Sequence, residues 1–229
     1  MLDVEIKPVG DAAVLAVLGD AVDPNVVSRV WSLARALRQA LRFGILDIVP
    51  AYASVLVRFD PFATDSARVM AGIRGAAETA VPAAESHARR LTIGVAFGAE
   101  CGIDLERTAH ELGMREARLR ETFCKPDYRV AFIGFLAGFP YLLGLAPALH
   151  VPRLPSPRPR VPSGSVAIAG GQCGIYPRST PGGWRILGRT NAPLFDPLRE
   201  PPALLAPGDV VRFIAERHLE DTGSVEIRR

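Results

Sequence analysis

The stretch of the sequence best suited to chemistry is rich in arginine and contains no acidic residue. Residues 151–195 hold six arginines, seven glycines and eight prolines, but no aspartate or glutamate. Arginine forks match carboxylates and phosphates bidentately, and glycine lets backbone N–H groups come close to a ligand. The stretch therefore favours binding of a small anion. Composition alone does not distinguish this from a turn-rich barrel whose surface carries scattered arginines.

Three short clusters refine this picture, and each also has a purely structural interpretation. Residues 134–141 (GFLAGFPY) combine glycine with aromatic residues, which indicates either the wall of a site or a sharply bent core segment. Residues 170–172 (GGQ) predict a ligand-contacting loop or, as glycines alone favour, a tight hairpin between two apolar strands. Residues 179–184 (STPGGW) predict a turn that ends in either a binding or a core tryptophan.

The familiar catalytic motifs are absent from the sequence. It contains no GxxxxGK[ST], HExxH or GxSxG motif, and its last hundred residues contain no lysine. The four histidines are too scattered to form a ligand pair at helical spacing. The cysteines are odd in number and form no CxxC pair: Cys101, Cys124 and Cys173. We therefore expect neither a zinc site nor a disulfide framework, and we expect a reducing, cytoplasmic location. These absences indicate a binding half rather than a complete catalytic unit.

Two segments resemble features of other protein classes. Residues 104–123 have the rhythm of a helix-turn-helix, but their five acids against four arginines oppose DNA binding, so an ordinary helical hairpin is expected. Residues 130–149 carry no charge over twenty residues, yet glycines and prolines interrupt them and no basic flank follows. Buried strand and loop are expected there. With a net charge of +3, we expect neither nucleic acid nor membrane as a partner.

The elements that must position these residues begin with a compact α+β unit over the first 88 residues. Asp23-Pro24 predicts the start of a helix, whose apolar side chains recur at three- and four-residue steps up to Leu41. A second helix is expected from Asp65. The alternation of strands and helices predicts an antiparallel sheet with both helices on one face. The strands are expected over 14–18, 45–49 and 53–59.

A β-rich unit is expected to follow, after a boundary in the stretch 81–90. Asp104 is expected to cap a helix that ends at Gly113, and a second short helix covers about residues 115–123. Beyond Tyr128, short apolar runs separated by glycine and proline favour a barrel or a sandwich. The strands of this unit are expected over 90–97, 161–169, 174–177, 184–189 and 210–215.

Five blocks in the second half of the chain, in order, carry a family resemblance: GFLAGFPYLLGL, PRLPSPRPRVPSGSVAIAGGQCGIYP, STPGGWRILGRT, PLFDPL and LLAPGDVVRF. They resemble the family of the 5-oxoprolinase B subunit, also called KipI-like or allophanate hydrolase subunit 1. The similarity covers about residues 90–215, whereas the first 88 residues match only in pattern. It implies a small α+β domain over 1–88, with an antiparallel sheet and two helices, and a cyclophilin-like β-barrel domain over 89–229.

The resemblance also implies a function. Members of this family act in an ATP-dependent 5-oxoprolinase, which converts 5-oxo-L-proline to L-glutamate with ATP hydrolysis. The partners would be a KipA-like protein (the 5-oxoprolinase C subunit) and a LamB/YcsF-like protein (the 5-oxoprolinase A subunit). ATP, with Mg, would be the co-substrate, and no biotin is expected. Two alternatives stay open: a non-catalytic regulator that inhibits a sensor histidine kinase, and a half-subunit of a carboxyltransferase-like enzyme that processes urea or allophanate.

By position in the matching blocks, the resemblance suggests which residues bind the anionic parts of the ligands. Arg153 and Arg160 would hold the substrate carboxylate or a nucleotide phosphate. Gln172 and the backbone N–H groups of Gly170 and Gly171 would line the floor. No catalytic residue and no metal ligand is assigned.

The remaining residues of the expected site are mostly aromatic. Phe139, Pro140 and Tyr141 would shape one wall. The cleft that faces the partner would be completed by four more residues: Tyr176, Trp184, Arg189 and Thr190. The expected result is an arginine-lined hollow without carboxylates. Relatives commonly carry histidine where this chain has Cys124, which leaves a histidine-dependent acid–base step in doubt.

Overall fold

The computed structural model describes residues 2–80, 88–98 and 100–228. The chain divides into two compact units, Met1–Ser86 and His87–Arg229, each with a hydrophobic core of its own. The stretch 81–90, where a boundary is expected, lies largely outside the described residues.

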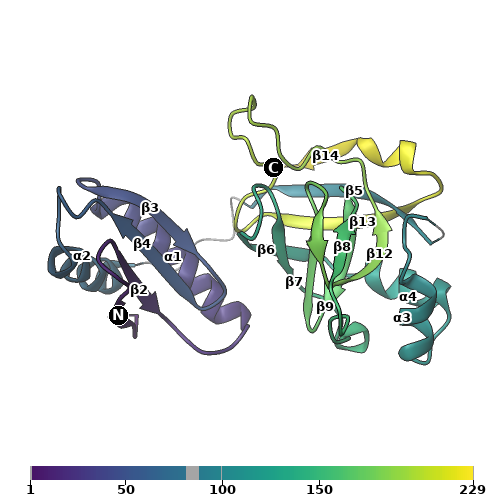
Figure 1. Ribbon diagram of the computed structural model, residues 1–229, viewed down its shortest axis with the longest axis horizontal. Coiled ribbons are helices and arrows are strands. Elements are labelled where there is room, and N and C mark those ends of the chain that lie inside the picture. Colours follow the sequence, from purple (N-terminus) through teal and green to yellow (C-terminus); the bar gives the residue numbers. More distant parts are fainter. Residues whose placement is uncertain (1, 81–87, 99, 229) are drawn as a thin grey trace. The chain divides into compact units, whose positions relative to one another are not determined.

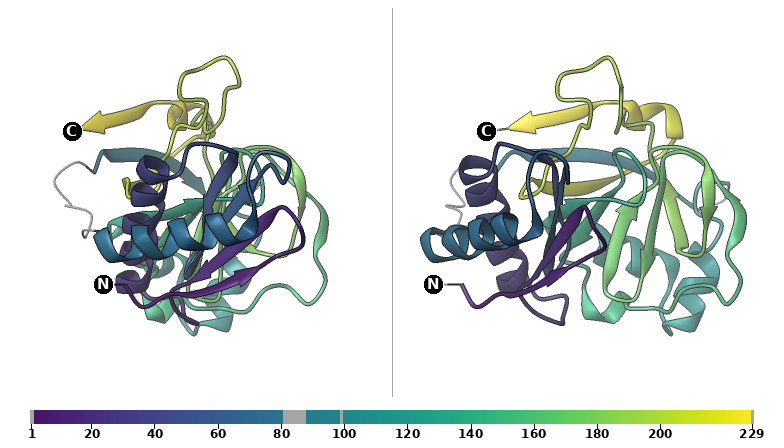
Figure 2. Two further views of the ribbon diagram at one scale, coloured as in Figure 1. Left: turned by 90° about the vertical axis from the view of Figure 1, so that its left-hand side faces the viewer. Right: turned by 60° about the vertical axis from the view of Figure 1, so that its left-hand side comes forward.

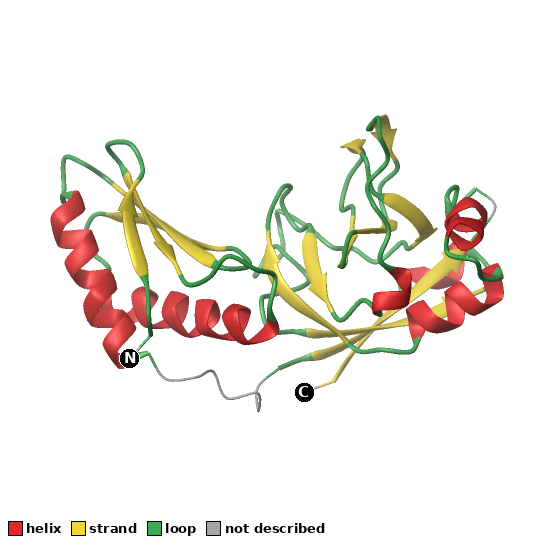
Figure 3. Cartoon of the chain, turned by 90° about the horizontal axis from the view of Figure 1, so that it is seen from below, coloured by secondary structure: helices red, strands yellow, loops and turns green. Residues whose placement is uncertain are grey.

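The first unit is an antiparallel sheet with two helices. The strands lie in the order β1-β2-β4-β3, and both helices lie on the same side of them (Figure 3). This confirms the architecture expected from the sequence, with one additional strand, β1, whose side chains are largely exposed. The elements are β1 (Glu5–Pro8), β2 (Ala13–Val17), α1 (Pro24–Ala40), β3 (Ile45–Pro50), β4 (Ser54–Phe59) and α2 (Ser66–Thr79).

Both helices of this unit begin where their caps predict. The Asp23 carboxylate accepts hydrogen bonds from the N–H groups of Asn25 and Val26, at 2.8 and 3.2 Å. The Asp65 carboxylate accepts one from the N–H of Arg68, at 2.8 Å. These bonds satisfy N–H groups that the first turn of a helix leaves without an intrahelical partner.

The second unit is a closed β-barrel of seven strands (Figure 1). The ring closes because β12 pairs with β5 as well as with β9. Strand β13 lies between β5 and β6, and it runs parallel to β5 over seven residue pairs. Outside the ring, β14 (Val225–Arg228) pairs with β5. The ring strands are, in spatial order, β12 (Arg185–Arg189), β9 (Ser165–Ala169), β10 (Gln172–Ile175), β7 (Pro140–Leu143), β6 (Tyr128–Ile133), β13 (Val210–Glu216) and β5 (Arg90–Phe97).

Two short helices, α3 (Leu105–Glu111) and α4 (Glu116–Cys124), lie together at one end of the barrel (Figure 2). Leu105, Leu119 and Phe123 are buried in the barrel core, so this segment is an ordinary helical hairpin. The uncharged segment 130–149 forms β6, β7 and a 3₁₀ turn, η2 (Pro147–Leu149). No helix among the described residues has the length and apolar character needed to cross a membrane. A further 3₁₀ turn, η3 (Leu219–Gly223), precedes β14.

A two-stranded ribbon lies outside the ring and covers part of it. It consists of β8 (Arg158–Val161) and β11 (Thr180–Gly182), which pair antiparallel. Val161 packs there in a separate apolar cluster, together with Ala167 and Ile186 from the ring. The single strand expected over 161–169 is therefore wrong: a turn at Gly164 separates β8 from β9. A Cβ at Gly164 would lie 1.9 Å from the Thr190 carbonyl oxygen.

Candidate functional site

Four aromatic side chains meet between the barrel and the ribbon. The ring centroid of Phe139 lies 5.0 Å from that of Tyr141, 5.1 Å from Tyr176 and 5.7 Å from Trp184. The contacts are tilted or edge-on, as aromatic quadrupoles favour. Leu142, the next residue after Tyr141 in β7, and its partner Val130 in β6 point to the other side of the sheet and belong to the barrel core. We call this set of four rings the aromatic layer.

Two glycines leave the space that the aromatic layer occupies. A Cβ at Gly174 would lie 2.7 Å from Cζ of Phe139, and one at Gly182 would lie 2.5 Å from the Tyr176 hydroxyl. Gly174 pairs with Tyr141 in the β10–β7 ladder, so the sheet places this glycine beneath the rings of the 139–141 segment. At these two positions, glycine is therefore needed to leave room for the aromatic rings.

Arg153 lies at the exposed side of the aromatic layer. Its guanidinium carbon is 5.9 Å from the Trp184 ring centroid, a cation–π distance. Burial raises the pKa of Tyr141 and of Tyr176, and the charge of Arg153 acts against that rise at both hydroxyls. Arg153 is itself exposed. The structure thus places one accessible guanidinium beside the Trp184 ring.

The other two arginines of the expected site lie on strands, Arg160 on β8 and Arg189 at the end of β12. Nε of Arg160 donates to the Ser179 hydroxyl across the β8–β11 ribbon, at 3.2 Å. Nε of Arg189 donates to the Ser163 carbonyl oxygen, at 2.8 Å. Arg160 is exposed and Arg189 is half-buried, so both retain polar atoms that a ligand could reach.

The Gly170-Gly171-Gln172 segment forms the tight β9–β10 hairpin, the second of its two expected forms. Gly170 has a φ of +56°, and its N–H donates to the Val151 carbonyl oxygen at 2.6 Å. That N–H is therefore engaged within the chain. Gln172 pairs with Ala169, which belongs to the same apolar cluster as Phe139, Tyr176 and Trp184. The half-buried side chain of Gln172 therefore lies on the same face of the sheet as the aromatic layer.

Burial separates the expected site residues into a supporting set and an accessible set. Phe139, Tyr176 and Trp184 are each exposed by 5% or less, and Pro140 is also buried. Thr190 is 2% exposed, and its hydroxyl donates to the Thr222 carbonyl oxygen and accepts from the Ala192 N–H. Phe139, Tyr176 and Trp184 support the surface from beneath, whereas the bonds of Thr190 lie with Thr222 and Ala192. The accessible residues are Tyr141, Arg153, Arg160, Gly170, Gly171, Gln172 and Arg189.

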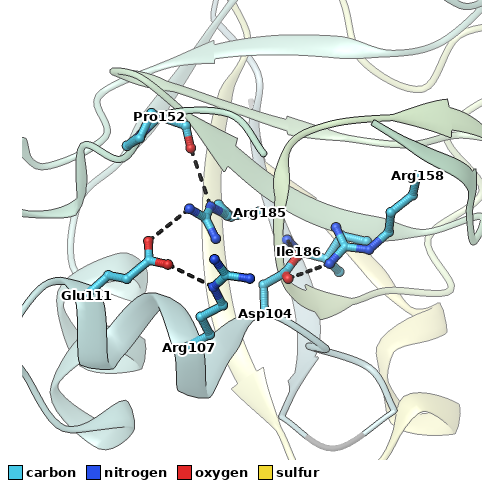
Figure 4. A network of polar contacts seen from close by, with 7 residues as sticks. All are labelled: Asp104, Arg107, Glu111, Pro152, Arg158, Arg185 and Ile186. Atoms are coloured by element: carbon cyan, nitrogen blue, oxygen red, sulfur yellow. Dashed lines mark hydrogen bonds and ion pairs between the residues drawn. The ribbon is translucent and has the colours of Figure 1, made fainter. Parts of the chain in front are cut away.

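Asp104 ties the ribbon to the barrel, a role that sequence reasoning missed. One carboxylate oxygen accepts from Arg158 at 2.5 Å, and the other accepts from the Ile186 N–H at 2.8 Å (Figure 4). The Asp104 N–H in turn donates to the Ile186 carbonyl oxygen at 3.0 Å. The expected start of α3 after Asp104 is confirmed, but the carboxylate makes no capping bond, because its oxygens accept from Arg158 and Ile186 instead.

A second acid, Glu111 of α3, pairs with Arg185. Arg185 is 3% exposed, and it donates to Glu111 at 2.8 Å and to the Pro152 carbonyl oxygen at 3.3 Å (Figure 4). Arg107 also donates to Glu111, and this bond, together with the charge of Arg185, holds the pKa of that carboxyl below its usual value. The carboxylate-free setting expected for the arginines is therefore wrong for Arg158 and Arg185, because their acids come from α3 and its start.

Phe135 is a further residue near the site that sequence reasoning did not select. It lies in the loop between β6 and β7, and 61% of it is exposed. Its ring stands edge-on to those of Phe139 and Tyr176, with centroids 5.6 and 6.5 Å apart. Phe135 lies within the glycine- and aromatic-rich motif at 134–141, which is the feature of the sequence that could have identified it.

Comparison with known proteins agrees with this architecture. The sequence profile of the carboxyltransferase domain, subdomain C and D, matches residues 4–205. The chain is 34% identical to the 5-oxoprolinase B subunit of Bacillus subtilis over 92% of each chain.

Solved structures show the same fold. The crystal structure of TTHA0988 matches with a TM-score of 0.80 and 38% identity; the match covers 91% of this chain and 40% of that longer one. The Kluyveromyces lactis urea amidolyase matches with a TM-score of 0.81 at 19% identity, over 98% of this chain and 16% of that one, which shows the fold alone. By its sequence over almost its whole length, the chain belongs to the family of the 5-oxoprolinase B subunit.

Proposed function

We propose that the chain is the B subunit of a cytoplasmic, ATP-dependent 5-oxoprolinase that opens 5-oxo-L-proline to L-glutamate. The observation that carries this is its identity of 34–37% with three proteins named as the B subunit of 5-oxoprolinase, over 91–92% of the chain. The companions would be the KipA-like C subunit and the LamB/YcsF-like A subunit. The barrel would be of the cyclophilin-like type.

The chemistry needs an activated lactam, since an amide carbonyl is a poor electrophile. Transfer of the γ-phosphoryl group of ATP to the lactam oxygen, followed by attack of water on the carbon, would open the C–N bond and release ADP and phosphate. Fixed donors stabilise the negative charge that develops in such steps. Arg153, whose exposed guanidinium is held beside Trp184, would instead bind a carboxylate or phosphate of the ligands.

The accessible residues fit the anionic ends of the ligands rather than a metal ion. Arg153, Arg160 and Arg189 are cationic, and Gln172 is neutral, so this set would hold the substrate carboxylate or a phosphate. In the described part of the chain, no group of three histidine, cysteine, aspartate or glutamate side chains is arranged to hold a metal. Mg²⁺ would therefore arrive with the nucleotide or be held by a companion subunit.

The proposal is tested with the chain and both companion subunits purified and mixed. ATP-dependent opening of 5-oxo-L-proline should appear only in the complete mixture, as coupled formation of glutamate and ADP. Arg153→Ala should raise KM for one of the two substrates about tenfold, the effect of losing roughly 1.4 kcal/mol of binding. Arg118→Ala is the matched control, since that arginine is exposed on α4 and pairs only with Glu121 among the interactions seen.

Absence of turnover in the complete wild-type mixture would refute the proposed function. Unchanged KM values in folded Arg153→Ala would remove this residue from the site. Arg160→Ala and Arg189→Ala answer the same question at the ribbon and at the end of β12.

One observation favours a second candidate function. The matching family profile is named for a carboxyltransferase domain, which suits a half-subunit of an enzyme that processes urea or allophanate. Such an enzyme would need biotin or bicarbonate. Turnover of urea or allophanate that depends on either, without 5-oxoproline opening, would favour this alternative.

A further inference from the structure

The backbone at Phe135 is held in an unfavourable conformation. The Leu136 N–H donates to the Gly134 carbonyl oxygen at 2.7 Å, a bond between residues two apart, and the residue between them has a φ of +63°. This is the rarer and more strained form of the γ-turn. In the described part of the chain, Phe135 is the one residue other than glycine with a positive φ.

The surrounding loop fixes this conformation. The Gly134 N–H donates to the Phe139 carbonyl oxygen at 3.1 Å, and the Phe139 N–H donates to the Leu136 carbonyl oxygen at 3.0 Å. Gly138 meets Phe195 closely, because a Cβ there would lie 2.7 Å from that of Phe195. Phe135 is thus held in place by bonds on both sides of it.

Burial of the ring does not account for the strain. Phe135 is 61% exposed, so it gains little from the core, and glycine would adopt the same φ without strain. Strained residues of this kind cluster at binding and catalytic sites, where the surrounding structure over-determines them. The exposed part of the ring is therefore available for contact with a ligand.

The rings beneath indicate what that is. Phe135 contacts Phe139 edge-on, Phe139 contacts Trp184, and Arg153 lies over Trp184. An exposed apolar ring and an exposed guanidinium therefore border the same buried layer. Such a pair suits a small molecule that carries a carboxylate on a ring with an apolar CH₂ face.

We propose that Phe135 is a ligand-contacting residue of the candidate site, whose ring covers the ring of a small carboxylate while Arg153 takes the carboxylate. This rests on the proposed function, in which 5-oxo-L-proline is such a molecule. Phe135 would then contribute to substrate binding, and its strained backbone would be the cost of presenting the ring.

The test uses the complete complex and the variants Phe135→Gly and Phe135→Tyr. Phe135→Gly should leave the Tm of the isolated chain equal to or above that of the wild type, because it relieves the strain. It should raise KM for 5-oxo-L-proline about tenfold at unchanged kcat, and leave KM for ATP unchanged. Phe135→Tyr should restore KM to near the wild-type value. Phe62→Gly, which removes a 99% exposed phenylalanine of the first unit, should change neither KM nor kcat.

Three results would overturn the proposal while the wild-type complex still turns over. The first is an unchanged KM for 5-oxo-L-proline in Phe135→Gly. The second is a change that assigns the ring to another partner. A changed KM for ATP alone would assign it to the nucleotide, and weaker binding of a companion subunit, with normal KM values once that subunit is saturating, would assign it to a protein contact. The third is a lower Tm with KM restored on cooling, which would make the residue structural. A wild-type complex without turnover would instead remove the proposed function, and this proposal with it.

Discussion

Replacing Asp104 by asparagine should remove the charge of this side chain while keeping its shape. The asparagine oxygen can still accept from the Ile186 N–H, and the backbone bond to the Ile186 carbonyl oxygen is unaffected. What is lost is the ion pair with Arg158, which joins the ribbon to the start of α3. We therefore expect the variant to fold with its barrel intact and its ribbon loosened.

The size of the effect follows from burial. The Asp104 side chain is 4% exposed and that of Arg158 is 26% exposed. Breaking a buried pair by removing one partner costs about 3–5 kcal/mol, and partial exposure of Arg158 lowers this to about 2–3 kcal/mol. Asp104→Ala also leaves the Ile186 N–H unpaired, which adds about 1–3 kcal/mol. The order of stability should be wild type, then Asp104→Asn, then Asp104→Ala.

These differences in the free energy of unfolding are measured by urea unfolding, monitored by tryptophan fluorescence emission. Trp184 is 5% exposed in the aromatic layer, and Trp31→Phe leaves it as the single tryptophan. Trypsin cleavage after Arg160, in β8, and after Arg178, just before β11, should be faster in Asp104→Asn. Glu121→Gln is the control: it breaks an exposed pair with Arg118 on α4 and should cost under about 0.5 kcal/mol.

A double-mutant cycle decides whether the ion pair is the cause. Asp104→Asn and Arg158→Met together should show a coupling free energy of about 1–3 kcal/mol. A coupling near zero, or an Asp104→Asn variant as stable as Glu121→Gln, would refute the role assigned to the Asp104–Arg158 pair in holding the ribbon.

Two further predictions concern stability. Gly102→Ala should cost at least about 1–3 kcal/mol, because its Cβ would lie 2.0 Å from the Leu187 carbonyl oxygen. Gly75→Ala adds a Cβ in α2 with nothing within 4 Å of it and should stabilise by about 0.5–1 kcal/mol; thermal unfolding measures both. Burial raises the pKa of the Cys124 thiol to about 11 from an ordinary 9.0, so the folded chain keeps a proton that the unfolded chain releases. The stability that Cys124 contributes should therefore be complete below pH 9 and fall as the pH rises towards 11, and Cys124→Ala should flatten that fall; an equal pH dependence in both proteins would contradict it.

Local signals in the sequence predicted the elements better than their assembly. Asp23-Pro24 and Asp65 fixed the starts of both helices of the first unit, and the strand expected over 90–97 has those bounds. The polar strand β1 was missed because exposed side chains leave no apolar pattern. Closure of the barrel depends on pairs such as Val210 with Arg90, which lie too far apart in the sequence for periodicity to relate them.

The candidate site could be predicted in its residue types but not in its charge balance. The window 151–195 contains no acid, yet Asp104 and Glu111 reach Arg158 and Arg185 from α3 and its start. A count of charged residues within one stretch of sequence does not include acidic residues that the fold brings in from other segments. The aromatic residues of the motifs do meet in space, but only the structure shows that Tyr176 and Trp184 lie beneath the surface and Phe135 upon it.

The insertion of β13 between β5 and β6 has a consequence for biosynthesis. The ribosome must release the chain at least as far as Glu216 before this strand, Val210–Glu216, can join its two neighbours, about 80 residues after β6. Until then, β5 and β6 present unpaired backbone edges, which are templates for association with other nascent chains. A polypeptide ending at residue 205, where the family profile stops, would keep those edges permanently and should be prone to aggregate.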